Sequence, residues 1–189
     1  MSGEDEPLLV TRALRRAGNT DFSMSCDQPV GELLAVLAAG LRPGARVLEL
    51  GTGVGVGLSW IVHGLSPRDD VSVLSVDLDP ALLDVARTEE WPSWVEFLCA
   101  DGAHVVEERG PFDLIFADAP GGKITALGAT VACLASQGIL LVDDMDPALH
   151  TTDDLLEPIQ TVRDTLLSDP RLITIEIPFS THVIIAVKR

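Results

Sequence analysis

The segment from Val47 to Gly57 constrains the fold of this chain more than any other. It begins as an apolar strand that carries one acid, Glu49, and continues with glycines at every second position from Gly51 onward. Glycine permits a tight turn and lets a ligand approach the backbone without a Cβ in the way. The apolar run 58–65 predicts a helix whose first N–H groups point toward the same place. The segment therefore predicts a strand, a turn and a helix. The glycines of the turn either make room for a ligand or are needed only for the tight change of chain direction.

Four more apolar segments predict buried strands, and each is followed by acidic residues. These strands are 71–76, 95–100, 112–117 and 138–142. The residues that follow them are Asp77, Leu78 and Asp79; Asp101 and Gly102; Asp118; and Asp143 with Asp144. Strands of this kind alternating with helices predict an α/β doubly wound sheet, in which ligands bind at the carboxyl ends of the strands.

The first two acidic strand ends have distinct expected roles. Asp77 follows the second strand, where a carboxylate can accept both hydroxyl hydrogens of a ribose. Asp79 precedes Pro80 and fits a helix N-cap. Asp101 fits either a contact to a bound cofactor or the N-cap of a short helix over 103–108.

The remaining segments predict helices and a terminal hairpin. Helices are expected over 8–17, over 29–39 with Asp27 as its cap, and over 152–168. The apolar runs 172–177 and 181–187 are joined by a few turn residues and predict a β-hairpin.

Composition narrows the class of protein. The 189 residues are expected to form one domain over 1–189, with 1–20 as an N-terminal helical segment. The net charge of −16 argues against nucleic acid and against an anionic membrane surface as partners. No apolar run is long enough for a membrane span and the first residues are acidic, so a cytoplasmic location is expected. Three cysteines without metal spacing predict free thiols, with Cys99 and Cys133 buried.

The pattern E-x-G-x-G-x-G from Glu49 to Gly55 resembles motif I of the class I S-adenosylmethionine (SAM) methyltransferases. The terminal hairpin is similar to the end of their sheet, so the resemblance extends over residues 20–189. It implies a Rossmann-like, mostly parallel seven-stranded sheet with a C-terminal antiparallel hairpin, and SAM as cofactor. The residues implied to bind SAM are Ser23, Met24, Glu49, Gly51, Thr52, Gly53, Gly55, Asp77, Leu78, Asp101, Gly102 and Asp118.

Within that superfamily, the chain resembles the small bacterial relatives of the catechol and caffeoyl-CoA O-methyltransferases. The matching segments are 22–25, 48–53, 112–119 and 140–144. The resemblance implies O-methylation of a small catechol-like or phenolic acceptor. It also implies a divalent metal held by Asp118, Asp143 and Asp144, and carboxylate oxygens suit Mg²⁺. The alternative for these acids is that they cap a turn at the strand ends.

Three departures from that group bear on the chemistry. Gly121 stands where the family has a lysine, and Lys123 is close by but out of register. Asp144 stands where the family has an asparagine, and the chain contains no tyrosine. Lys123 and His150 are the candidate catalytic residues, with His150 either a general base or a solvated loop residue.

Two other functions stay open at this stage. One is a catalytically inert SAM-binding fold that acts as a binding or regulatory protein, which the missing lysine and tyrosine favour. The other is an NAD-dependent oxidoreductase, which Val56 disfavours because the dinucleotide fingerprint G-x-G-x-x-G requires glycine there. We expect a homodimer, because an apolar hairpin at the edge of a sheet is normally covered.

Overall fold

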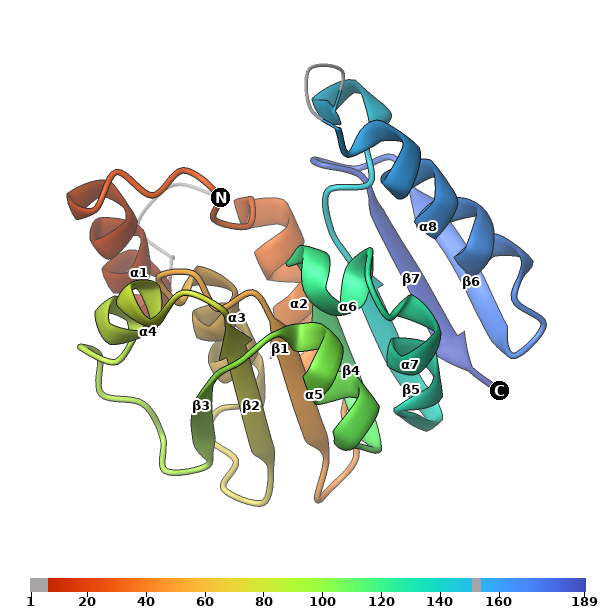
Figure 1. The fold of residues 1–189 in the computed structure, drawn as a ribbon. Coiled ribbons are helices and arrows are strands. Elements are labelled where there is room, and N and C mark those ends of the chain that lie inside the picture. The colour runs from red at the N-terminus through yellow and green to blue at the C-terminus, as the bar shows by residue number, and fades with distance from the viewer. Residues whose placement is uncertain (1–6, 151–153) are drawn as a thin grey trace.

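The computed structural model describes residues 7–150 and 154–189 and contains one seven-stranded sheet in the order β3-β2-β1-β4-β5-β7-β6 (Figure 1). The strands are β1 (Arg46–Leu50), β2 (Ser72–Asp77), β3 (Val95–Cys99), β4 (Phe112–Ala117), β5 (Leu134–Val142), β6 (Leu172–Ile177) and β7 (Val183–Lys188). The first five pair in parallel, while β7 pairs antiparallel with both β5 and β6. The predicted mostly parallel sheet with a terminal antiparallel hairpin is confirmed.

Helices cover both faces of the sheet. They are α1 (Leu8–Asn19), α2 (Gln28–Ala39), α3 (Val56–Leu65), α4 (Pro80–Ala86), α5 (Gly102–Glu108), α6 (Pro120–Lys123), α7 (Leu127–Ala132), the 3₁₀ turn η1 (Pro147–His150) and α8 (Leu156–Ser168). One hydrophobic cluster joins α1, α2 and α3 to one face, and a second joins α5, α7 and α8 to the other. In the described residues, no helix is long and apolar enough to cross a membrane.

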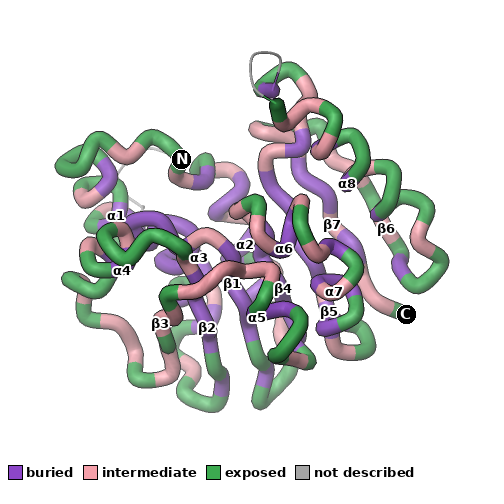
Figure 2. Tube along the Cα trace, in the orientation of Figure 1, coloured by how far each residue is buried: buried purple, intermediate pink, exposed green. Residues whose placement is uncertain are grey.

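A row of apolar side chains crosses the middle of the sheet. Leu74, Leu48, Ile115, Leu140 and Ala186 are register partners on five neighbouring strands, and all are buried. Figure 2 shows the same concentration of buried residues in the central strands. Four of these strands, β2, β1, β4 and β5, run parallel and are held in register, so their carboxyl ends form one edge, where acidic residues predicted from the sequence come together.

Several local expectations needed correction. Asp27 precedes α2 but makes no side-chain cap bond; its carboxylate accepts a hydrogen bond from Ser180. The helix expected over 58–65 begins at Val56, and the one expected over 152–168 begins at Leu156; residues 152 and 153 lie outside the described part. Asp79 does cap α4, accepting from the Ala81 N–H at 2.8 Å.

The exposure of one cysteine also differs from the sequence expectation. Cys99 is exposed, whereas Cys26 and Cys133 are buried, and all three are free thiols. Position 99 ends β3, an edge strand of the sheet, so an apolar neighbourhood in the sequence does not ensure burial. On the opposite edge strand, β6, Ile173 and Ile175 are 60% and 57% exposed.

Candidate functional site

The glycine turn after β1 requires its glycines. Gly51, Gly53 and Gly55 have φ values of +104°, +52° and +89°, in the left-handed region that other L-residues rarely adopt. A Cβ on Gly53 would lie 2.9 Å from the ring of Phe22, so this position is also sterically closed. Gly55 is the N-cap of α3, which starts at the next residue. The turn thus places a helix N-terminus at the carboxyl edge of the sheet.

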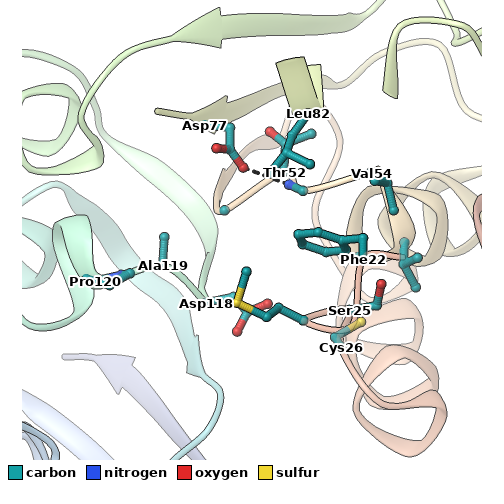
Figure 3. A pocket seen from close by; sticks show the side chains of 15 residues that line it. Phe22, Ser25, Cys26, Thr52, Val54, Asp77, Leu82, Asp118, Ala119 and Pro120 are labelled. Atoms are coloured by element: carbon teal, nitrogen blue, oxygen red, sulfur yellow. Dashed lines mark hydrogen bonds between the residues drawn. The ribbon is translucent and has the colours of Figure 1, made fainter. Parts of the chain in front are cut away.

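Asp77 holds this turn in place. Its Oδ2 accepts the Gly53 N–H at 2.7 Å, the bond drawn in Figure 3, and its Oδ1 accepts the Asp79 N–H at 2.9 Å. Each carboxylate oxygen can accept more than one hydrogen bond, so the side chain can still bind hydroxyl groups of a ligand. Asp77 therefore combines a structural role in the turn with a position in the wall of a cavity.

Glu49 lies behind the turn and does not contribute to the described cavity walls. Its Oε2 accepts the Ser75 hydroxyl at 2.5 Å, and Ser75 in turn is 2.6 Å from the hydroxyl of Thr52. Complete burial raises the pKa of Glu49 well above its ordinary value, so the neutral form is favoured. The structure therefore connects this acid to the turn through two hydroxyl groups, and the direct SAM contact that the resemblance implied stays a prediction.

Three adjoining cavities run along the carboxyl edge of the sheet. The turn cavity, about 200 Å³, lies against Thr52, Gly53 and Asp77. The rim cavity, about 380 Å³, includes Leu78 and Asp101. The acid cavity, about 420 Å³, lies on the other side of the turn cavity, toward the carboxyl end of β5.

Shared wall residues make these cavities neighbours. The turn and rim cavities have in common Gly51, Asp77, Ala119 and Pro120. The turn and acid cavities have in common Met24, Ser25, Cys26 and Asp118. In Figure 3, Ser25 and Cys26 come from the segment before α2, and Asp118 comes from the end of β4. The cavities follow the order rim, turn, acid, with Asp77 at the first junction and Asp118 at the second.

The remaining predicted cofactor residues are distributed over these cavities. Gly102 joins Asp101 in the rim cavity, where Asp101 also caps α5 by accepting the Ala103 N–H at 2.9 Å. Ser23 lies in the wall of the acid cavity alone. Gly55 lies outside all three walls, and a Cβ there would approach Trp91 at 3.1 Å.

The three aspartates predicted as metal ligands contribute to the wall of the acid cavity, together with Asp27. Asp118 follows β4, while Asp143 and Asp144 follow β5. Asp144 has a φ of +56°, so the chain has left the extended conformation and both neighbours can reach one cavity. Burial raises the pKa of Asp143 to about 6, although the Thr181 hydroxyl and the Asp144 N–H donate to its carboxylate. Burial, and then the charge of Asp143, hold the pKa of Asp118 well above its ordinary value.

Lys123 lies beneath these acids and is buried. Its Nζ donates to the backbone oxygens of Asp143 at 3.1 Å and of Asp118 at 3.5 Å, and it lies 3.9 Å from Oδ2 of Asp144. It is not part of the described cavity walls. This side chain therefore links the ends of β4 and β5 and brings a positive charge close to Asp144.

The donor set does not fit a ready-made metal site. Within the described residues, no three His, Cys, Asp or Glu side chains are grouped so as to hold a metal ion. One oxygen of Asp143 already accepts two hydrogen bonds, and the Lys123 ammonium lies close to Asp144. The described side chains therefore offer no preformed metal site, and the predicted metal role of Asp118, Asp143 and Asp144 stays a prediction.

His150 ends η1 and contributes to the wall of the acid cavity. The residue is 8% exposed, and its Nε2 is 3.0 Å from the backbone oxygen of Asp144. The sequence placed this histidine in a loop above the sheet edge, and the structure brings it into the same cavity as Asp118. A base role for it stays a prediction.

Sequence reasoning missed the parts of the site that come from distant segments. Phe22 packs against Gly53, and Thr181, from the loop between β6 and β7, reaches Asp143. Ser25 and Cys26 form part of the junction between the turn and acid cavities. Burial raises the pKa of the Cys26 thiol well above its ordinary value, which disfavours a nucleophilic thiolate.

Comparison with known proteins gives consistent results. Residues 48–145 match the family model described as a methyltransferase domain. A Mycobacterium bovis protein with the provisional name O-methyltransferase is 28% identical over 199 residues, covering 97% of this chain and 86% of that protein. A Mycobacterium tuberculosis protein named catechol O-methyltransferase is 29% identical over 153 residues, covering 75% of this chain and 66% of that protein.

A solved structure shows the same fold. The O-methyltransferase TomG from Streptomyces achromogenes, crystallised in complex with SAM, superposes with a TM-score of 0.82 at 19% identity. The match covers 97% of this chain and 91% of that chain.

Proposed function

The chain belongs to the class I SAM-dependent methyltransferases, and from that membership we propose that it transfers the SAM methyl group to a hydroxyl of a small catechol-like or phenolic acceptor. The observation that carries this proposal is the row of rim, turn and acid cavities, in which neighbouring cavities share wall residues. A donor that occupies the first two would present its reactive end to the third. The curated relative named catechol O-methyltransferase supports the acceptor class. We further propose that residues 1–189 form one domain.

Each part of SAM has a place in this arrangement. We place the adenine in the rim cavity beside Asp101 and Gly102, and the ribose at Asp77. The methionine part would occupy the turn cavity, where the free N–H groups at the start of α3 are close to its carboxylate. The sulfonium of SAM supplies an electrophilic methyl group. It would lie near the junction between the turn and acid cavities, where Asp118 is located.

The acceptor would then occupy the acid cavity. Its hydroxyl oxygen forms a bond to the methyl carbon while the carbon–sulfur bond breaks, and the hydroxyl proton must leave. We propose His150 as the group that takes this proton, because the ring contributes to the wall of that cavity. Lys123 acts by holding the ends of β4 and β5, and so by positioning Asp118 and Asp143.

Cofactor binding is the first test. A thermal shift or calorimetric titration should show binding of SAM and of S-adenosylhomocysteine (SAH), and no binding of NAD. Binding of NAD alone would overturn the proposal.

Turnover is the second test, because the absence of the family lysine at Gly121 favours the inert SAM-binding alternative. Radiolabelled SAM should transfer its methyl group to members of a panel of catechols and monophenols. His150→Ala should lower kcat, whereas substitution of the exposed surface residue His63 by Ala should not. SAH binding without turnover on any member of the panel would favour the inert alternative.

A further inference from the structure

Arg16 is a largely buried arginine that reaches the glycine turn from the N-terminal helix. It lies in the last turn of α1, which packs against α3 and α4 (Figure 1). Its side chain is 12% exposed, and its Nε donates to the Val54 backbone oxygen at 3.1 Å, across 38 positions of the chain. Burying a charged group costs free energy unless hydrogen-bond partners replace the water. The partners of Arg16 therefore show what its burial achieves.

The other contacts of this guanidinium come from the turn and from the segment after α4. Nη1 donates to Oε2 of Glu89 at 2.8 Å, and the Glu89 side chain is 7% exposed. The guanidinium carbon lies 5.8 Å from the centre of the Trp91 ring, within the range of a cation–π contact. Nη2 is buried and would lie 3.5 Å from a Cβ on Gly55. One side chain thus joins α1, the glycine turn and the segment after α4.

The peptide group between Val54 and Gly55 is held at both of its polar atoms. Its N–H, which belongs to Gly55, donates to the backbone oxygen of Thr52 at 2.9 Å, and its oxygen accepts from Arg16. Because a peptide group is planar, these two bonds together fix its orientation. Gly55 is the N-cap of α3, and Val54 contributes to the wall of the turn cavity. Arg16 therefore fixes from α1 a part of the turn that the bonds of Asp77 do not reach.

We propose that Arg16 is a positioning residue for the methyl donor, which acts by holding the Val54 backbone oxygen and so the turn against which the methionine part of SAM binds. Arg16 lies outside the described cavity walls, so it acts through the turn and not by contact with SAM. The inference rests on the proposed function, because it takes the turn cavity as the place of the methionine part. Loss of Arg16 should therefore weaken the affinity for SAM, and methyl transfer at saturating SAM should change little.

The test is a calorimetric titration of the full chain with SAM and with SAH, in the wild type and in Arg16→Ala. We expect both dissociation constants to rise at least about fivefold in the variant. The titrations are made at a temperature at which thermal unfolding shows each protein to be fully folded. Under that condition the dissociation constant does not depend on global stability, so a merely structural role of Arg16 would leave it unchanged.

Two further variants assign the effect to the bond with Val54. Arg12→Ala is the matched control, because Arg12 lies on the same helix and donates to the same partner, Glu89, at 3.0 Å. It should leave SAM affinity unchanged. Glu89→Gln combined with Arg16→Ala removes the carboxylate that has lost its buried partner, so it should recover stability but not SAM affinity. If Arg16→Ala alone does not fold, this double variant is compared with Glu89→Gln instead.

Three outcomes would overturn the inference: wild-type SAM affinity in Arg16→Ala, an equal loss of affinity in Arg12→Ala, or recovery of affinity together with stability in the double variant. The proposed function is judged separately, by SAM binding and methyl transfer in the wild type. A wild type that binds SAM and methylates a phenolic acceptor, with an affinity that does not depend on Arg16, would keep the proposed function and refute this inference. A wild type that binds neither SAM nor SAH would refute both.

Discussion

Replacement of Asp77 by alanine should weaken SAM binding and loosen the glycine turn at the same time. The structure shows two hydrogen bonds from backbone N–H groups to this carboxylate, at 2.7 Å from Gly53 and 2.9 Å from Asp79. The proposed ribose contact adds to them. Because one side chain serves both purposes, its loss should exceed the effect of removing a ligand contact alone.

The size of the effect follows from these bonds. A hydrogen bond to a charged group contributes about 1.5–3 kcal/mol. Loss of the ribose contact alone corresponds to roughly 10- to 100-fold weaker binding. Loss of the two turn bonds should add to this, since the Gly53 N–H and the rest of the turn would no longer be held beside the ligand.

Calorimetric titration with SAM measures this loss, and two further variants separate its causes. Asp77→Asn keeps one acceptor oxygen, so it should lose less affinity than Asp77→Ala. Asp79→Ala removes the cap of α4, which accepts from Ala81, and should lower stability by about 1 kcal/mol with little change in SAM affinity. Wild-type affinity in Asp77→Ala would refute the assignment of Asp77 to the cofactor site.

Four other predictions follow from the site and the sheet. Gly53→Val should abolish SAM binding, because its Cβ would lie 2.9 Å from the Phe22 ring at a φ of +52°; normal binding would mean that the turn has a structural role alone. Burial raises the pKa of Glu49, so the stability contributed by its neutral form is present at low pH and is lost as pH rises above the ordinary carboxyl range; urea unfolding should therefore show Glu49→Gln gaining on the wild type as pH rises from the acidic range, and a constant difference would contradict this. A metal-assisted reaction would stop in EDTA and return with Mg²⁺ or Mn²⁺, with Asp118→Asn and Asp143→Asn more damaging than Asp144→Asn; undiminished turnover in EDTA would remove the metal. The exposed apolar face of β6 supports a homodimer, which light scattering should detect and which a one-chain mass at high micromolar concentration would exclude.

Much of the fold could be predicted because local patterns encode it. Buried parallel strands are continuous apolar runs, and their alternation with helices predicts the layered sheet. Glycine at positive φ and aspartate before proline have local steric and hydrogen-bonding causes, so the turn at Gly53 and the cap at Asp79 were visible without a structure. The carboxyl ends of parallel strands share one edge, so Asp77, Asp101, Asp118 and Asp143 could be assigned to one site region.

Local patterns could not show how distant segments contact each other. The sequence places Asp27 before a helix, where capping is the expected role, but its partner Ser180 is 153 residues away. Phe22 against Gly53, and Thr181 against Asp143, depend in the same way on the folding of the hairpin and the N-terminal segment over the sheet edge.

The sequence by itself determined the order of strands and helices, the glycine turn and the edge where the acids gather, because these follow from backbone sterics and from the burial of apolar runs. The tertiary structure alone decided the burial and the partners of individual side chains. Glu49 is buried behind the turn, Lys123 is directed to the ends of β4 and β5, and Cys99 is exposed at the sheet edge. These outcomes depend on which elements pack against one another, and side chains far apart in the chain compete for the same buried space and hydrogen-bond partners.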